Sequence, residues 1–178
     1  SLLAKIGTSD PIEAFTDIQT LIDQFSFDKF SRAPARFDPE ELKRINARVL
    51  HQLDYADVRD RLAAMDADGG EAFWHAVAPN LERLSDARTW HTLIEGPVTP
   101  VIEEADYIAQ AAAALPEGEL TAESWGIWTG SLKEITGRKG KALFMPLRMA
   151  LTGEQHGPDM SELLPLIGRD RALDRLKA

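Results

Sequence analysis

Apolar residues recur every three to four positions along most of the chain, which is the spacing of amphipathic helices. The clearest stretch is 38–53, where Asp38 supplies a cap, Pro39 occupies the first helical position and Glu41 is placed for a reciprocal capping bond. A second helix, capped by Asp54, is expected to end at Asp68-Gly69-Gly70. No segment alternates with period two or carries a hairpin turn, so the sequence predicts an all-α fold.

Further helices are expected over residues 71–84, 86–94, 102–115 and 121–136, with Pro79 kinking the first and Thr121 capping the last. Glycine and proline separate the helices into groups at Gly69-Gly70 and at Pro116-Glu117-Gly118. We therefore expect three parts, residues 1–67, 68–118 and 119–178.

The segment 140–171 combines an apolar helix with a turn. Its apolar residues spread around the helix, which predicts a largely buried helix, and Arg148 interrupts them. Gly153 is a left-handed stop, Gly157-Pro158-Asp159 is a turn, and Asp159 can cap a helix over Met160–Ile167. The pattern predicts an exposed loop with a guanidinium beside it. A surface arginine next to an ordinary helix connection is the alternative interpretation.

Composition indicates a folded globular chain, because 44% of its 178 residues are hydrophobic and 28% are charged. No apolar run approaches the roughly 20 residues that span a bilayer, and no signal-peptide pattern is present. The absence of cysteine excludes disulfides and thiolate metal sites and is compatible with the cytoplasm. Because the sequence opens with Ser1 inside an apolar helical pattern, we interpret it as part of a longer protein.

The charge is unevenly distributed. The net charge is −9, which does not favour nucleic acid as a partner, since phosphate affinity comes from lysine and arginine. Residues 1–132 carry 11 basic and 23 acidic residues, whereas residues 133–178 carry 9 basic and 6 acidic residues. The basic end is therefore the end that holds Arg148.

The sequence carries no catalytic constellation. Its four histidines lack metal-type spacing, and no phosphate-binding glycine loop or nucleophile elbow is present. The four tryptophans are candidates for stacking on unpaired bases, but their helical spacing favours the core. They are Trp74, Trp90, Trp125 and Trp128.

Long stretches at both ends resemble bacterial glutamyl-tRNA synthetases. SLLAKIGTSDPIE and FDKFSRAPARFDPEELKRINARVL are similar to the segment that follows the lysine-rich signature loop of the catalytic domain. Asn46 falls on the family's Leu-x-x-x-Asn helix. KALFMPLRMALTG, followed by GP and LLPLIGRDRALDRL, is similar to the closing segment, whereas residues 69–118 match only in helical layout.

This resemblance implies a helical stem-contact region over residues 1–67, followed by a cage of two anticodon-binding subdomains. It places a tRNA stem contact on Asn46 and anticodon contacts on Arg148 and on the loop residues Gly157, Pro158, Asp159 and Met160. A guanidinium can stack on or hydrogen-bond a splayed base, and exposed loop backbone can read the edge of a pyrimidine.

The family's nucleotide-binding catalytic domain is missing from this sequence. The resemblance therefore implies no catalytic residue, metal or cofactor within the chain. It implies that the complete enzyme joins glutamate to tRNA(Glu) in the cytoplasm with ATP and Mg²⁺. Neither DNA nor a membrane is an expected partner.

Asn80 departs from the family's pattern. Members that reject glutamine tRNA often carry an arginine where the alignment places Asn80, next to Pro79. A short neutral amide there is expected to weaken discrimination between C and G at the last anticodon base. We hypothesise that the parent enzyme also charges tRNA(Gln) with glutamate.

Two other functions stay open at this point. The class I lysyl-tRNA synthetases share a helical anticodon cage, which predicts a preference for lysine tRNA. An acidic helical scaffold for protein interactions is the second alternative, with residues 1–132 as its binding surface.

Overall fold

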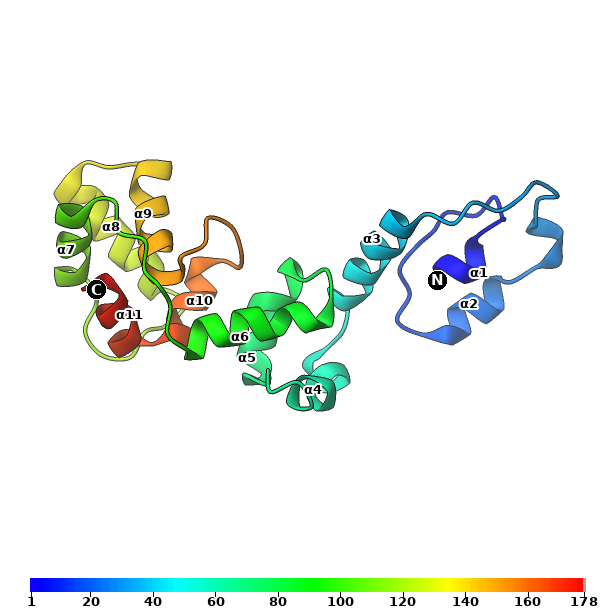
Figure 1. Cartoon of the computed structure of the whole chain (residues 1–178), viewed down its shortest axis with the longest axis horizontal. Coiled ribbons are helices and arrows are strands. Elements are labelled where there is room, and N and C mark those ends of the chain that lie inside the picture. The colour runs from blue at the N-terminus through cyan, green and yellow to red at the C-terminus, as the bar shows by residue number, and fades with distance from the viewer. Residues whose placement is uncertain (178) are drawn as a thin grey trace.

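The structure is a computed structural model that describes residues 1–177 as an elongated row of helices (Figure 1). The α-helices are α1 (Leu2–Lys5), α2 (Ile18–Gln24), α3 (Pro39–Leu50), α4 (Tyr55–Ala63), α5 (Gly70–Val77), α6 (Ala87–Glu95), α7 (Ala105–Ala113), α8 (Ser124–Thr136), α9 (Lys141–Thr152), α10 (Met160–Ile167) and α11 (Arg169–Leu176). The 3-10 helices are η1 (Phe27–Lys29), η2 (Ala78–Asn80) and η3 (Leu84–Asp86). Within residues 1–177, the β-structure is limited to an isolated antiparallel bridge between Thr8 and Phe30. The all-α prediction is confirmed.

Helix α3 begins at its predicted cap but without the predicted reciprocal bond. The carboxylate of Asp38 accepts a hydrogen bond from the N–H of Glu40 at 2.9 Å. Glu41 instead pairs with Arg44 at 2.5 Å, one turn further along the helix. The side chain of Glu41 therefore pairs with Arg44 and does not make the reciprocal capping bond at the start of the helix.

The helices around Pro79 and Thr121 differ from the prediction at their ends. Helix α5 ends at Val77, and Pro79 lies in the 3-10 helix η2, because proline lacks the N–H that would continue the α-helix. Helix α8 begins after Glu123, so Thr121 is not its cap. The N–H of Thr121 instead donates to Oγ of Ser124 at 2.8 Å.

One hydrophobic core runs from Leu50 in α3 to Leu176 in α11. Its largest side chains are Trp74 and Trp128, whose indole N–H groups donate to backbone carbonyls at 2.8 and 2.9 Å. Helix α4 packs against α5 across Gly69-Gly70, so the core is continuous where the first boundary is expected. The division into residues 1–67, 68–118 and 119–178 stays a prediction.

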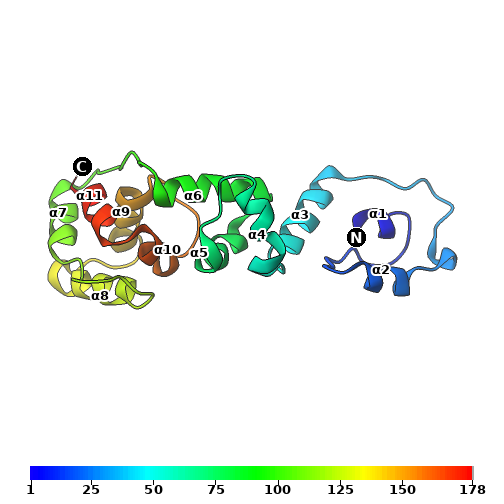
Figure 2. The same cartoon turned by 90° about the horizontal axis from the view of Figure 1, so that it is seen from below.

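Residues 1–38 lie at one end of the row, beside α3 (Figure 2). Leu2 is buried in α1, which contacts α3. Phe25, Phe27 and Phe30 gather on one another, with ring centroids 5.1 to 6.5 Å apart, but Phe27 is 82% exposed. This part therefore contributes little to the main core. No helix within residues 1–177 has the length and apolar character needed to cross a bilayer.

A buried arginine joins the ends of two helices. Arg175 of α11 donates to the carbonyl of Leu151 at 2.8 Å and to those of Leu93, Ile94 and Gly96 at 2.7, 3.1 and 3.2 Å. These carbonyls lie at the C-terminal ends of α9 and α6, where the helix dipole favours a cation. Burial lowers the pKa of Arg175 from its ordinary value. The guanidinium thus connects the two expected anticodon-binding subdomains.

Candidate nucleic-acid interface

Helix α9 has a buried side and an open side. Leu143, Leu147 and Leu151 are buried, whereas Phe144 is 43% exposed. The helix is largely buried, as predicted, and its remaining side is open because α7, α8 and α11 cover only part of the helix. Phe144 and Arg148 are four residues apart and so share that open side.

The guanidinium of Arg148 reaches the loop that follows α9. Its Nη2 donates to the carbonyl of Pro158 at 2.5 Å. Its Nη1 is buried and has no hydrogen-bond partner within residues 1–177. Burial lowers the pKa of Arg148, and Asp159 opposes that effect. Arg148 is therefore a partly desolvated cation with one donor committed to the loop.

The turn out of α9 is fixed by local hydrogen bonds. Gly153 has φ +72°, the left-handed stop that the sequence predicts. The hydroxyl of Thr152 donates to the carbonyl of Arg148 at 2.7 Å and accepts the N–H of Glu154 at 3.0 Å. The loop therefore leaves the helix in one direction, toward Trp90.

The side chain of Trp90, in α6, packs against the loop that follows α9. A Cβ built at Gly157 would lie 2.1 Å from Cη2 of this indole, and Gly157 has φ +145°. Only glycine fits that conformation and that close approach. Trp90 itself is half-buried, unlike the fully buried Trp74 and Trp128. Sequence reasoning placed Trp90 in the core and did not associate it with the loop.

The other loop residues predicted to contact the anticodon differ in their exposure to solvent. Pro158 and Met160 are buried, so the side chain of Met160 belongs to the core. Asp159 is exposed and caps α10, accepting the N–H of Ser161 at 2.8 Å and its hydroxyl at 2.7 Å. The backbone N–H bond from Ser161 is the main reason that the pKa of Asp159 lies below its ordinary value. The structure thus brings Arg148, Gly157, Pro158 and Asp159 together.

Asn46 and Asn80 lie on other elements. The amide of Asn46 donates to the carbonyl of Glu82 at 2.5 Å, which connects α3 to the segment after η2. Asn80 is exposed at the end of η2. Asn46, the predicted stem contact, is therefore already hydrogen-bonded within the chain, whereas Asn80 is open to solvent.

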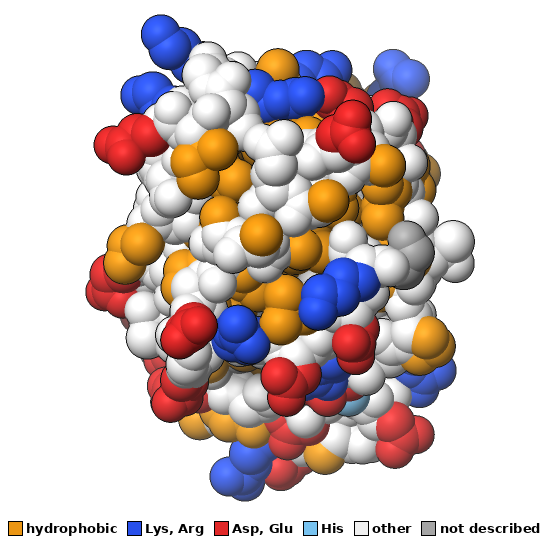
Figure 3. Space-filling model, turned by 90° about the vertical axis from the view of Figure 1, so that its left-hand side faces the viewer, with side chains coloured by type: hydrophobic (Ala, Val, Ile, Leu, Met, Phe, Trp, Pro, Cys, Tyr) orange, Lys and Arg blue, Asp and Glu red, His pale blue; other side chains and the backbone are white. Residues whose placement is uncertain are grey.

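Two aromatic side chains, Trp125 and Phe144, lie together at the open side of α9. Trp125 of α8 is half-buried, and its ring centroid lies 6.2 Å from that of Phe144. Figure 3 shows the end of the molecule formed by α7, α8 and α11. Lysines and arginines gather at its upper rim, the edge where Figure 1 draws the connection between α8 and α9. Lys139 lies in this connection and Lys141 is the first residue of α9, and both lysines are exposed.

No metal centre is defined by the part of the chain that the structure describes. No cluster of three or more histidine or acidic side chains could hold a metal ion within residues 1–177. The arrangement offers loop backbone, a partly buried guanidinium, aromatic rings and exposed cations. These groups suit the recognition of an unpaired nucleic-acid base.

Comparison with protein families identifies the segment that contains this loop. Residues 100–178 match the family described as the anticodon binding domain. The class of protein that the fold and the site define is therefore a helical anticodon-binding module.

Comparison with curated proteins extends the similarity to the whole chain. The chain is 62% identical over 176 residues to glutamate–tRNA ligase 1 of Maricaulis maris and 51% identical over 176 residues to that of Parvibaculum lavamentivorans. The alignments cover 99% of this chain but only 40% and 39% of the two relatives. The chain belongs to the glutamate–tRNA ligase family and spans about two fifths of the length of these members.

Solved structures show the same fold. The glutamate–tRNA synthetase of Elizabethkingia anophelis matches 91% of this chain with a TM-score of 0.74 and 20% identity, covering 35% of that protein. A glutamate–tRNA ligase of Elizabethkingia meningosepticum, solved with its amino acid, matches with a TM-score of 0.75 and 20% identity; the match covers 91% of this chain and 36% of that protein. The resemblance stated from the sequence is confirmed. None of these matches supports the lysyl-tRNA synthetase or the protein-interaction scaffold.

Proposed function

We propose that this chain binds the anticodon of tRNA(Glu) for an enzyme that attaches glutamate to that tRNA. The observation that carries the proposal is the hydrogen bond from Arg148 to the carbonyl of Pro158, inside the segment that matches the anticodon-binding family. It holds a glycine-containing loop beside a guanidinium. Such a loop can present backbone donors and acceptors to an unpaired base.

In this proposal, Arg148 has two roles. One side of its guanidinium fixes the loop through Pro158, and the plane of the group supports a base by stacking or by hydrogen bonding. The half-buried Gly157 and the exposed Asp159 contribute loop backbone, and Met160 contributes only its backbone because its side chain is in the core. Asn46 lies near a stem, outside the anticodon loop.

A binding experiment with altered anticodons tests this function. A tRNA(Glu) transcript and the same transcript with a swapped anticodon are titrated with the chain at several salt concentrations. We expect tighter binding of the first transcript and a steep loss of affinity with salt, because bound phosphates release counterions. Equal affinity for both transcripts, or no binding to either, overturns the proposal. The second result is the one that a protein-interaction scaffold predicts.

The finer choice of tRNA rests on Asn80. We propose that its short, exposed amide leaves the last anticodon base loosely read, so that tRNA(Gln) is charged with glutamate as well as tRNA(Glu). Aminoacylation of purified tRNA(Gln) by the complete enzyme tests this directly. Detectable glutamyl-tRNA(Gln) is the expected result, and an absence of charging contradicts it. Asn80→Arg is expected to reduce charging of tRNA(Gln) more than that of tRNA(Glu).

The chemistry belongs to the complete enzyme in this proposal. ATP and Mg²⁺ serve the attachment of glutamate, and the site for that reaction lies in the catalytic domain of the glutamate–tRNA ligases. The residues described here bind and orient the tRNA. The cytoplasm is the expected compartment because translation uses the product there.

A further inference from the structure

A groove between α7 and α11 lies apart from the loop at Arg148. Its volume is about 590 Å³. Figures 1 and 2 both show α7 and α11 at the end of the row opposite residues 1–38, whereas the loop between α9 and α10 lies toward α6. A ligand in this groove would therefore leave the loop accessible.

Most of the groove is apolar. Ile108 and Leu176 are buried in its lining, and Leu173 is half-buried. The side chains that α7 adds to the lining are otherwise short, and they are Ala105, Ala109, Ala112 and Ala113. Figure 3 looks onto this end of the molecule and shows hydrophobic side chains across the middle of the face, with charged side chains around them. Short side chains let another helix approach closely, because the distance between packed helices depends on the side chains at their contact.

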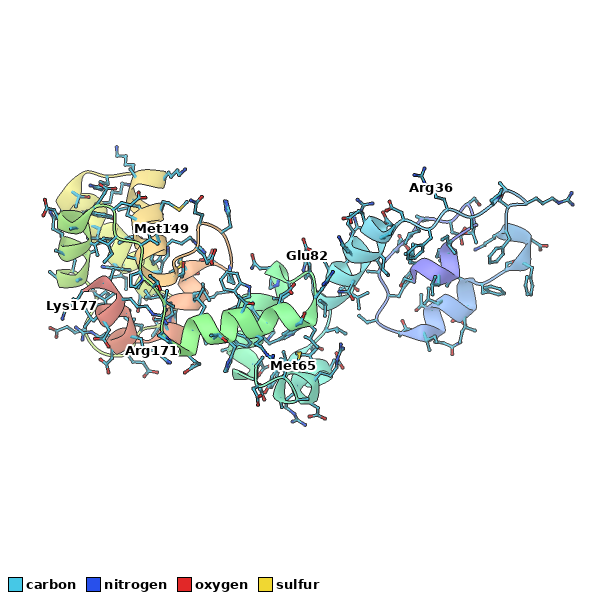
Figure 4. The ribbon with its side chains drawn as sticks, in the orientation of Figure 1. Arg36, Met65, Glu82, Met149, Arg171 and Lys177 are labelled. Atoms are coloured by element: carbon cyan, nitrogen blue, oxygen red, sulfur yellow. The ribbon has the colours of Figure 1, made fainter. Side chains whose placement is uncertain are left out.

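Both charged side chains in the lining are cations, Arg169 and Lys177. Figure 4 labels Lys177 and also Arg171, which lies on the same helix but outside the groove. Arg171 pairs with Glu95, whereas neither Arg169 nor Lys177 forms an ion pair within residues 1–177. Nε of Arg169 donates to the carbonyl of Pro116 at 2.9 Å, which holds this guanidinium in place. The lining therefore favours a ligand that carries negative charge at two points.

The spacing of the two cations fits a helical ligand. Arg169 and Lys177 are eight residues apart, which places them about 12 Å apart along the axis of a helix. Two acidic residues seven positions apart on a second helix share one face and are separated by about 10 Å along its axis. Apolar residues three and four positions after the first acid lie on that face between them. Such a helix can place its apolar residues over Leu173 and its acids beside the two cations.

We propose that this groove binds an acidic amphipathic helix of a partner protein, with two acids about two turns apart on either side of its apolar residues. The apolar residues supply the affinity, and the complementary charges guide the approach and fix the register. RNA is less suited to the groove, because the lining offers two cations around an apolar surface and phosphate binding needs more. The inference goes beyond the proposed function and does not depend on it.

A helical peptide with this pattern tests the proposal directly. It carries two glutamates seven residues apart, with leucines three and four residues after the first glutamate. A matched peptide has lysines in place of the glutamates, and fluorescence anisotropy measures the binding of each to the chain. We expect the acidic peptide to bind at least about tenfold more tightly, because like charges repel across an interface. Equal binding of the two peptides, or no binding of the acidic peptide, overturns the proposal.

Two neighbouring substitutions on α7 separate the groove from the surrounding surface. Ala109 is exposed and lines the groove, so Ala109→Glu places a larger and negatively charged side chain there while keeping a good helix former. Gln110 is exposed and lies outside the lining, so Gln110→Glu adds the same charge one residue away. We expect Ala109→Glu to weaken binding of the acidic peptide by about tenfold or more and Gln110→Glu to bind it nearly as the unaltered chain does. Similar losses in both variants contradict the proposal.

Lys177→Glu tests the charge of the groove from the side of the protein. Lys177 is exposed, so the substitution is expected to leave the fold intact. The preference for the acidic over the basic peptide should shrink by about tenfold, because one attraction becomes a repulsion. An unchanged preference would show that Lys177 does not face the ligand and would overturn the predicted register.

Two further measurements address other occupants of the groove. Sedimentation at increasing concentration is expected to show no self-association that Ala109→Glu abolishes; such an association would assign the groove to a second copy of the chain and overturn the proposal. Titration with tRNA(Glu) is expected to give the same affinity for Ala109→Glu and for the unaltered chain, and weaker binding by the variant would assign the groove to RNA instead. If the chain ignores the anticodon but the peptides bind as expected, only the proposed function fails.

Discussion

The indole of Trp90 lies directly against the backbone of Gly157, so closely that a Cβ at position 157 would come within 2.1 Å of the ring. The loop between α9 and α10 therefore packs against α6, a helix that is far from it in the sequence. Gly157→Ala is expected to displace the loop and to lower the free energy of unfolding by about 1–3 kcal/mol. Urea unfolding measures the loss, and titration with tRNA(Glu) is expected to show weaker anticodon preference.

Gly130→Ala is the matched control for that substitution. Gly130 lies inside α8, and a Cβ built there meets no atom within 4 Å. Alanine is the better helix former, so the free energy of unfolding is expected to rise by about 0.5–1 kcal/mol. A loss of stability at both positions would show that the Trp90 contact is not the cause of the effect at Gly157.

Arg148→Ala tests the guanidinium beside the loop. The change removes the bond to Pro158, but it also removes a partly buried cation with an unpartnered Nη1. Because these effects on folding oppose each other, we expect little change in thermal stability. The affinity for tRNA(Glu) is expected to fall by about 1–3 kcal/mol, with reduced preference over the swapped anticodon. A collapse of thermal stability with the preference intact would make Arg148 purely structural.

Arg175→Ala should lower the free energy of unfolding far more than the same substitution of a surface arginine does. The substitution leaves the carbonyls of Leu93, Ile94, Gly96 and Leu151 without their donor, and we expect a loss of about 3 kcal/mol or more. Arg171→Ala, which mainly removes an exposed pair with Glu95, should cost about 1 kcal/mol or less. Urea unfolding of both variants compares them, and similar losses would contradict this role of Arg175.

Asp159 is expected to make stability depend on acidity. Hydrogen bonds from Ser161 hold the pKa of Asp159 below its ordinary value of 3.8. A carboxylate with a depressed pKa contributes stability above its unfolded pKa and loses it as the pH falls through the folded pKa. The difference in unfolding free energy between the unaltered chain and Asp159→Asn should therefore shrink below about pH 4. Urea unfolding at pH 7 and pH 3 measures it, and a constant difference would exclude this contribution.

Local features of the sequence predicted local structure well. Asp38, Gly153 and Asp159 end or begin helices as expected, because caps and left-handed stops depend on a few neighbouring residues. The family resemblance then located Arg148 and the loop. No pattern in the sequence indicated that the side-chain amide of Asn46 would donate a hydrogen bond to the backbone carbonyl of Glu82, 36 residues away.

Long-range contacts were the part that sequence reasoning missed. Periodicity shows which side of a helix faces a core, but it does not show which residue it meets there. Trp90 packs against the core, as the sequence predicted, but its close approach to Gly157 was not predicted. Nothing in the sequence pointed to a role for Arg175, because the carbonyls that it binds lie 24 to 82 residues away.

The Arg175 contacts also bear on what happens if the chain is cut. A break between residues 118 and 119 would put the end of α6 in one fragment and Arg175 in the other, leaving the carbonyls of α6 without their donor and Arg175 with only its bond to Leu151. Neither piece has a substitute for its missing half. The two fragments should accordingly fold by complementation when mixed, as a reconstituted whole rather than as independent units.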